Sequence, residues 1–165
     1  KTPIYVKTKS ELSKCDALII PGGESTVMSK MIDFNNLRQA IIDLKDEINI
    51  MGICAGMIML SSTKGYNNLK TLSIMNFKVE RNGFGRQINS FKSKIKFLPS
   101  NNNINVSFIR APKIKTFSDE NQCIAKFDGK PVMLTDGRHI ACSFHPEFSL
   151  DNDIYEYFTN LVKVS

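Results

Sequence analysis

Short apolar runs alternate with segments of helical periodicity in the first third of the chain. Residues 17–20 and 48–53 are almost wholly apolar, which is typical of strands buried on both faces of a parallel sheet. Between them, Ser25 and Thr26 can cap a helix whose apolar residues recur at helical spacing up to Asp46. This alternation predicts an α/β fold, in which functional residues gather at the C-terminal ends of the parallel strands.

The middle of the chain has a different pattern. Shorter strand-like segments, at residues 72–80, 88–91, 94–97 and 105–109, favour an antiparallel excursion over another βαβ unit, with a loop tip at residues 101–103. Asp-Gly at 136–137 separates two apolar-rich segments, 132–135 and 138–144, and predicts a hairpin. Residues 152–164 have the amphipathic pattern of a closing helix. We therefore expect one domain over residues 1–165.

Composition narrows the classes of function. The chain has 165 residues, a formal net charge of +6 and four cysteines without Cys-x-x-Cys spacing. The lysines are scattered and no basic-aromatic motif accompanies them, so we do not expect nucleic-acid binding. No segment has the pattern of a signal peptide or a membrane span, which favours a cytoplasmic protein with reduced thiols. The chain starts at Lys1 and reaches a strand-like piece at residues 4–6, so we expect an N-terminal segment to be absent.

The candidate nucleophile is Cys54, in the sequence Gly-Ile-Cys-Ala-Gly at residues 52–56. It follows a predicted strand and precedes the apolar face of a predicted helix, residues 57–60, so it is expected on a strand-to-helix turn. Glycines two positions before and after it remove side chains that would crowd such an elbow. The helix N-terminus favours a thiolate, and the N–H of Ala55 can hold an oxyanion.

The candidate base is His145, in the sequence Phe-His-Pro-Glu at residues 144–147. In an extended segment His145 and Glu147 share a face, so the carboxylate can fix one ring nitrogen while the other faces the thiol. A single Cys or His is more often a structural residue. The elbow glycines and the His-x-Glu pair together favour a Cys-His-Glu acyl-transfer enzyme, with no metal and no cofactor. His139, near the hairpin turn, is expected to be exposed and inert.

Three further segments carry candidate chemistry. Gly22 and Gly23 end the first predicted strand, where their N–H groups can face an oxyanion, and Glu24 and Ser25 offer polar groups to a small substrate. The alternative there is a tight turn with a helix cap. Arg81 and Arg110 can pair with a substrate carboxylate, although a surface loop and a solvated strand end are the alternatives for these two positions.

These segments together resemble a known family. They are residues 21–26 (Pro-Gly-Gly-Glu-Ser-Thr), 52–56, 80–87 (Glu-Arg-Asn-Gly-Phe-Gly-Arg-Gln), 108–112 (Phe-Ile-Arg-Ala-Pro) and 143–147 (Ser-Phe-His-Pro-Glu). The chain is similar to class I, triad-type glutamine amidotransferases, and within them to the glutaminase subunits of pyridoxal 5′-phosphate synthase. The elbow and His-Pro-Glu are general to the class, whereas the blocks at 80–87 and 108–112 are particular to this subunit. The strand, Leu-Gln-Gly loop and helix with which the family normally opens are not found here.

The resemblance implies a flavodoxin-like α/β fold, with a mostly parallel central sheet flanked by helices and an antiparallel excursion. It implies the triad Cys54, His145 and Glu147, and ammonia delivery to a barrel-shaped synthase subunit in a hetero-oligomeric complex. The glutamine contacts it implies are Gly23, Glu24, Ser25, Arg81, Ile109 and Arg110, and with the residue-based reasoning above the oxyanion donors are Gly22, Gly23 and Ala55. Three alternatives are a glutaminase serving another ammonia-channelling enzyme, a peptidase or redox chaperone of related fold, and a non-catalytic binding subunit.

Overall fold

The structure is a computed structural model that describes residues 2–63, 69–81, 83 and 90–164. Its helices are α1 (Lys9–Leu12), α2 (Ser25–Phe34), α3 (Leu37–Asp43), α4 (Ala55–Leu60), the 3-10 helix η1 (Pro146–Phe148) and α5 (Asp153–Val164). Its strands are β1 (Ala17–Ile20), β2 (Asn49–Ile53), β3 (Phe77–Glu80), β4 (Ser90–Phe97), β5 (Asn102–Ile109), β6 (Lys113–Phe117), β7 (Gln122–Phe127), β8 (Lys130–Thr135) and β9 (Ile140–Cys142). Among these helices, none is long and apolar enough to span a membrane.

The main sheet has the strand order β1-β2-β9-β8-β7-β4-β5, and β3 pairs with β6 in a separate two-stranded sheet. β1, β2 and β9 run parallel, with Gly52 of β2 paired to both Ile20 and Ala141. The α/β fold is therefore confirmed. The sheet is mixed rather than mostly parallel, because β8 turns back directly into β9 and the β4, β5 and β7 strands also pair antiparallel.

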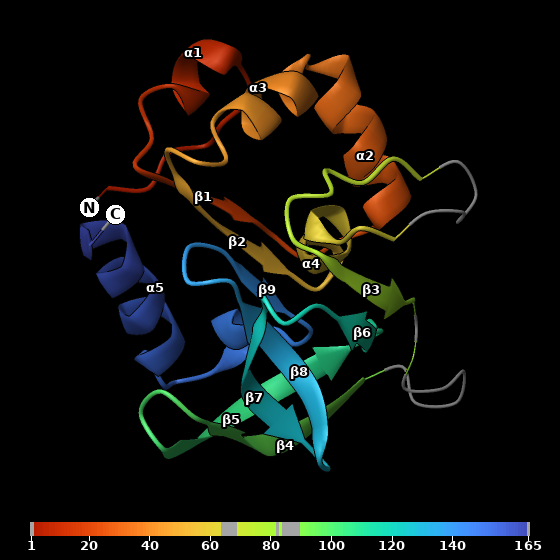
Figure 1. Ribbon diagram of the computed structural model, residues 1–165, viewed down its shortest axis with the longest axis vertical. Coiled ribbons are helices and arrows are strands. Elements are labelled where there is room, and N and C mark those ends of the chain that lie inside the picture. The colour runs from red at the N-terminus through yellow and green to blue at the C-terminus, as the bar shows by residue number, and fades with distance from the viewer. Residues whose placement is uncertain (1, 64–68, 82, 84–89, 165) are drawn as a thin grey trace.

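Two apolar cores lie on the two faces of the sheet. One core contains side chains of the four helices α1, α2, α3 and α4, such as Leu12, Ile41 and Leu60. The other packs α5 against the antiparallel strands through Phe97 and Phe158. Figure 1 shows α1, α2 and α3 above β1 and β2, with α5 on the other side. β2 and β9 are buried on both faces, as the apolar run of β2 predicts. β1 is the edge strand and Ile19 is 44% exposed, so the expectation that residues 17–20 are buried on both faces was wrong.

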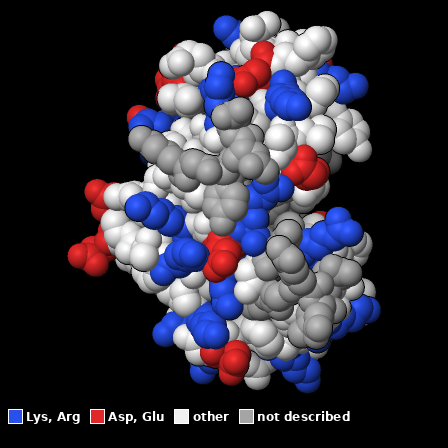
Figure 2. Space-filling view, turned by 90° about the vertical axis from the view of Figure 1, so that its right-hand side faces the viewer, with Lys and Arg blue, Asp and Glu red and all other residues white. Residues whose placement is uncertain are grey.

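Basic and acidic side chains are interspersed on the face drawn in Figure 2. Figure 2 shows lysine and arginine side chains from the helical end of the molecule to the antiparallel end, with acidic side chains among them. Ion pairs join Arg38 to Asp33 and Lys115 to Glu80. This distribution agrees with the scattered lysines of the sequence.

The expected helix from Ser25 to Asp46 is two helices. The break is at Asn35 and Asn36, and Asn36 has φ 55°, a left-handed conformation that an α-helix cannot contain and that asparagine tolerates better than most residues. The cap is also different, because the Glu24 carboxylate accepts from the N–H groups of Thr26 and Val27, at 3.1 and 2.8 Å. The expectation of a Ser25 or Thr26 cap was therefore wrong.

Several expected strand limits also change. The strand at 72–80 is only Phe77–Glu80, and the hairpin strand at 138–144 is only Ile140–Cys142. The segments 88–91 and 94–97 belong to one strand from Ser90 onward, with 88 and 89 outside the described residues. β5 starts at Asn102, inside the expected loop tip, because the turn is made at Asn101 with φ 57°. Residues 4–6 form no strand in this structure and are mostly exposed.

Candidate active site

Cys54 lies on the turn between β2 and α4, as predicted. Its φ of 51° and ψ of −102° are unusual for a residue with a side chain and mark a sharp elbow. The flanking glycines leave room for close backbone packing. A Cβ on Gly56 would lie 2.0 Å from the Ile20 carbonyl oxygen, and one on Gly52 would lie 2.6 Å from the Gly56 backbone. The elbow therefore packs directly on the end of β1.

The thiol of Cys54 is protonated in this arrangement. Burial raises its pKa to about 11, the N–H of Ala55 acts in the opposite direction, and the Glu147 carboxylate raises it further. The Sγ atom lies 3.6 Å from the Ile109 carbonyl oxygen, to which the thiol donates. The Ala55 N–H lowers the pKa of Cys54, which is the direction expected of the helix N-terminus, but the effect of burial is larger.

His145 and Glu147 form a close pair, with 2.6 Å between Nδ1 and Oε1. His145 directly precedes the short helix η1 and Glu147 lies within it, because Pro146 begins a 3-10 turn. The expectation that the two residues share a face of an extended segment was therefore wrong. The His145 backbone N–H donates to the Ser107 carbonyl at 2.8 Å, which fixes this segment to β5. No local sequence signal marks Ser107, since the contact joins segments far apart in the chain. The pairing through Nδ1 leaves Nε2 for another partner.

The parallel pairing of β2 and β9 brings the thiol and the His-Glu pair to one edge of the sheet. The Cys54 N–H donates to the Cys142 carbonyl at 2.7 Å, three residues before His145. Glu147 is near enough for its charge to act on the Cys54 pKa. Gly22, at the end of β1, lies against the imidazole, where a Cβ would be 2.4 Å from His145 Cε1. Three strand ends therefore converge here.

The segment after β1 presents unusual polar groups to this edge. Gly23 has φ 146°, a conformation that disfavours any side chain. Ser25, at the start of α2, is 2% exposed, and its hydroxyl has no hydrogen-bond partner in the described structure. A buried hydroxyl without a partner is costly, and among the described side chains only Ser25 and Asn121 have such an atom.

Arg81 reaches the same segment. Its guanidinium donates to Glu24 Oε1 at 2.8 Å, and the Thr26 hydroxyl lies 3.5 Å from its Nη1 atom. The hydrogen bonds from the Val27 and Thr26 N–H groups lower the pKa of Glu24, and Arg81 adds to that effect. Within the motif at 80–87, residues 82 and 84–87 lie outside the described residues.

Ile109 ends β5 beside the thiol, and Arg110 follows it. The Ile109 carbonyl contacts Cys54, whereas Arg110 is exposed and has φ 46°. The structure thus brings the Ile109 backbone to the thiol but leaves the Arg110 side chain at the surface. Among the described residues, no group of three or more His, Cys, Asp or Glu side chains has the geometry of a metal site.

His139 is buried, so the expectation that it is exposed was wrong. It is 4% exposed, and its Nδ1 accepts from the Ile50 N–H at 3.1 Å. The signal that could have indicated burial is its place directly before the apolar run of β9, inside the predicted hairpin.

Comparisons with known proteins agree with this arrangement. The model of the SNO glutamine amidotransferase family matches residues 2–164. This chain belongs to that family. A pyridoxal 5′-phosphate synthase subunit PdxT from Tropheryma whipplei is 42% identical over 161 residues, covering 96% of this chain and 85% of the relative. A protein of the same name from Thermosipho africanus is 38% identical over 159 residues, with 96% and 85% covered.

Solved structures show the same fold for this SNO family member. A glutamine amidotransferase crystal structure superimposes with a TM-score of 0.90 at 32% identity, covering 96% of this chain and 85% of that one. A glutamine amidotransferase from Thermotoga maritima has a TM-score of 0.56 at 13% identity, covering 93% and 68%, and shows likeness of fold alone.

Proposed function

We propose that this chain is the glutaminase subunit of a pyridoxal 5′-phosphate synthase. It hydrolyses L-glutamine to L-glutamate and ammonia, and the ammonia passes to the synthase subunit. The observation that carries the proposal is the convergence of Cys54, on its elbow, with the His145–Glu147 pair at one sheet edge. The family membership and the names of the relatives support the substrate and the pathway.

The reaction starts with proton transfer, since the resting thiol is protonated. Cys54 gives its proton to His145 Nε2 as Sγ bonds to the side-chain amide carbon of glutamine, and the carbonyl electron pair moves onto oxygen. Glu147 holds Nδ1 and stabilises the imidazolium. Collapse of the intermediate breaks the carbon–nitrogen bond, and His145 gives its proton to the departing nitrogen, which leaves as ammonia.

The second half regenerates the thiol. Water loses a proton to His145 and attacks the thioester carbon, and the carbon–sulfur bond then breaks to release glutamate. His145 returns the proton to sulfur. The N–H groups of Ala55 and of the Gly22-Gly23 segment would stabilise the oxyanion in both halves. No cofactor enters either half.

Glutamine recognition is assigned to the segment after β1 and to two strand ends. The unpartnered Ser25 hydroxyl and the Glu24–Arg81 pair offer hydrogen bonds to the charged end of the substrate. The Ile109 carbonyl, at the end of β5, approaches the thiol from a different strand, and Arg110 follows directly after it. Gly23 leaves space for the bound amide.

The partner in this proposal is a barrel-shaped synthase subunit that receives ammonia in a hetero-oligomeric complex. Both relatives are named as subunits of the synthase. The described cysteines are free thiols, which suits the reducing cytoplasm.

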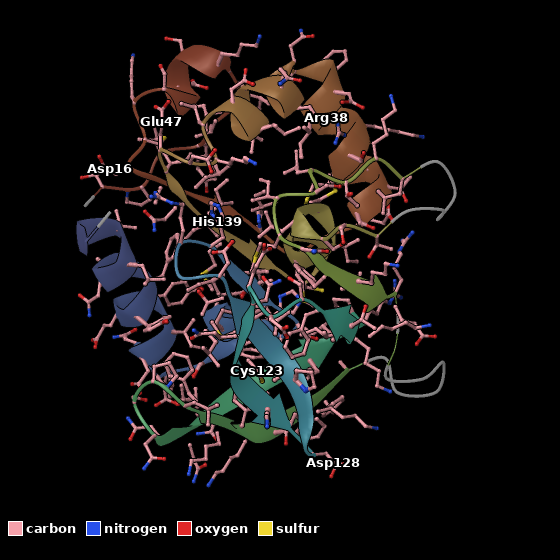
Figure 3. All side chains as sticks on the ribbon, in the orientation of Figure 1. Asp16, Arg38, Glu47, Cys123, Asp128 and His139 are labelled. Atoms are coloured by element: carbon pink, nitrogen blue, oxygen red, sulfur yellow. The ribbon has the colours of Figure 1, made fainter. Side chains whose placement is uncertain are left out.

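The test measures glutamate release from glutamine by the parent chain and by Cys54→Ala, each with and without the synthase subunit of the same organism. The parent should release glutamate, and Cys54→Ala should lose about a thousandfold or more of the rate. Cys123→Ala is the control, because Cys123, labelled in Figure 3, lies half-buried in β7, which β8 separates from β9 in the sheet. Retained glutamate release by Cys54→Ala would reject the nucleophile. Activation by the ammonia acceptor of another pathway, and not by this synthase, would move the chain to a sister function.

A further inference from the structure

A buried pair of side chains links β2 to β9 at the ends of these strands opposite the candidate site. The His139 imidazole, on the segment before β9, accepts from the Ile50 N–H of β2 at 3.1 Å. In the other direction, the Asn49 side-chain amide donates to the Arg138 carbonyl at 3.0 Å. Figure 3 shows His139 beside β2, between the helical layer and the antiparallel strands. Each strand therefore binds the backbone of the other through a side chain.

The two contacts continue the pairing of the strands. The regular register joins Met51 to Ile140 and Ile53 to Cys142. The next two pairs in the same register are Ile50 with His139 and Asn49 with Arg138. These are the positions that the two side chains connect. A slip of one residue would break both contacts and would move the side chains of the slipped strand to the opposite faces of the sheet.

His139 is held firmly at this position. The backbone N–H of His139 donates to the Asp136 side chain at 2.6 Å, and its backbone carbonyl accepts from the Thr135 hydroxyl at 2.8 Å. Asn49 and His139 are 1% and 4% exposed, so water cannot replace the missing partner if either contact is lost.

The imidazole is in the form that can accept a hydrogen bond. Burial lowers the pKa of His139, although Asp136 and Asp46 act in the opposite direction. Arg138 and Lys45 add to the lowering. The ring is therefore neutral at neutral pH, with its proton on Nε2 and its Nδ1 lone pair directed at Ile50.

We propose that His139 and Asn49 are positioning residues that fix β2 against β9 and so set Cys54 against His145. β2 leads from Ile50 to Cys54 in four residues, and β9 leads from His139 to His145 in six. The only described hydrogen bond of the Cys54 N–H is to Cys142, on β9. A shift between the strands therefore moves the thiol relative to the imidazole. The role in turnover rests on the proposed glutaminase function.

The test compares His139→Leu with His139→Asn. Leucine fills the space without an acceptor, whereas the asparagine Oδ1 is as many bonds from Cα as Nδ1 and can accept from Ile50. His139→Leu should lower kcat for glutamate release by about ten- to a hundredfold, because small misplacements of reacting groups have effects of that size. KM should stay near that of the parent, since Ser25 and Arg81 lie on other elements. His139→Asn should recover most of kcat.

Asn121→Leu is the matched control. Asn121 is also buried, at 4% exposed, and also holds a distant backbone carbonyl, that of Asn76, at 2.9 Å. It lies between β6 and β7, outside the strands that carry Cys54 and His145. This variant should lose thermal stability as His139→Leu does, but keep the kcat of the parent.

Amide exchange gives a readout that does not need activity. In His139→Leu the Cys54 N–H should exchange with deuterium at least about tenfold faster than in the parent, because its acceptor is on β9. Asn121→Leu should leave that exchange unchanged. If His139→Leu does not fold, Asn49→Ala cuts the other contact and leaves the imidazole in place.

Unchanged Cys54 exchange and unchanged kcat in either folded variant would overturn the proposal. Failure of His139→Asn to recover kcat would overturn the acceptor role. A parent that releases no glutamate rejects the proposed function, while the exchange of Cys54 still decides whether the strand contacts position the thiol.

Discussion

Gly22 has no room for a side chain, and the atom that excludes one belongs to His145. A Cβ at this position would lie 2.4 Å from Cε1 of the ring. Gly22→Ala should therefore displace the imidazole and lower glutamate release by about ten- to a hundredfold, in a protein that still folds. Steady-state kinetics and thermal unfolding check this.

Gly129→Ala is the control for Gly22→Ala. Gly129 has φ 71° with open space around its Cβ position, so alanine there adds backbone strain of about 1 kcal/mol and touches nothing at the site. Equal kinetics in Gly22→Ala and the parent would show that the ring can move away without loss of function.

The reactivity of Cys54 should report its raised pKa. With a pKa of about 11, the thiolate fraction rises about tenfold per pH unit from neutrality up to that value. Alkylation of Cys54 by iodoacetamide, located by peptide mass spectrometry, should increase over this range without a plateau below pH 10. A plateau near neutral pH would instead indicate a thiolate–imidazolium pair in the resting protein.

Local motifs made some residues predictable. The glycines around Cys54 and the spacing of His145 and Glu147 are local constraints, and the elbow and the pair were both found. The protonated thiol and the burial of His139 depend on segments that fold over them from elsewhere. The place of His139 before the apolar run of β9 favours its burial, but no window of sequence contains the distant contacts themselves.

Arg38 joins three elements through one planar group. Its guanidinium donates to Asp33 and Ser29 of α2, and to the carbonyls of Lys70 and Thr71 in the loop before β3. A lysine carries a single ammonium group, which cannot reach all of these acceptors at once as the planar guanidinium does. Arg38→Lys should therefore lower the free energy of unfolding by about 2–3 kcal/mol, measured by urea denaturation.

The neighbouring Gln39 supplies the comparison. Within the described part of the chain its exposed side chain donates to Asp43 on the same helix and to no other group, so Gln39→Ala should change the free energy of unfolding by less than about 0.5 kcal/mol. If the free energy of unfolding fell by similar amounts in the two variants, the hydrogen bonds of the Arg38 guanidinium would not be a main source of stability.

The break between α2 and α3 shows why element limits are hard to predict. Apolar residues keep helical spacing through Asn35 and Asn36, so the periodicity alone predicts one helix. The observed chain turns at Asn36, and Arg38 then folds back onto Ser29 and Asp33. Asparagine allows the turn, but the contacts formed after it make the turn favourable.

The strands of the sheet were easier to predict from the sequence than their pairing. Continuous apolar runs predicted β1 and β2, and Asp-Gly predicted the β8–β9 hairpin. The proportion of antiparallel pairing was underestimated, because a short strand does not reveal which neighbour it will join. The register of β4 against both β5 and β7 is a product of packing distant segments.

Activity should depend on the synthase partner, because the isolated chain holds Cys54 as a hydrogen-bonded thiol with a raised pKa. The Cys54 thiol is protonated and donates to Ile109, and its backbone is in a strained conformation. A partner that binds the reactive arrangement more tightly must shift the equilibrium toward it. Glutamate release should rise at least about tenfold on titration with the synthase subunit, within the usual range of coupling between sites.

Sedimentation separates binding from activation in this titration. Cys54→Ala should bind the synthase as the parent does but release no glutamate, because the substitution removes only the attacking atom from a buried elbow. The activation curve of the parent should saturate at the synthase concentration that saturates binding. Full activity of the isolated chain would contradict this dependence. Binding without any rise in rate would place the activating step in substrate capture, where the unpartnered Ser25 hydroxyl and the Glu24–Arg81 pair are the groups to test next.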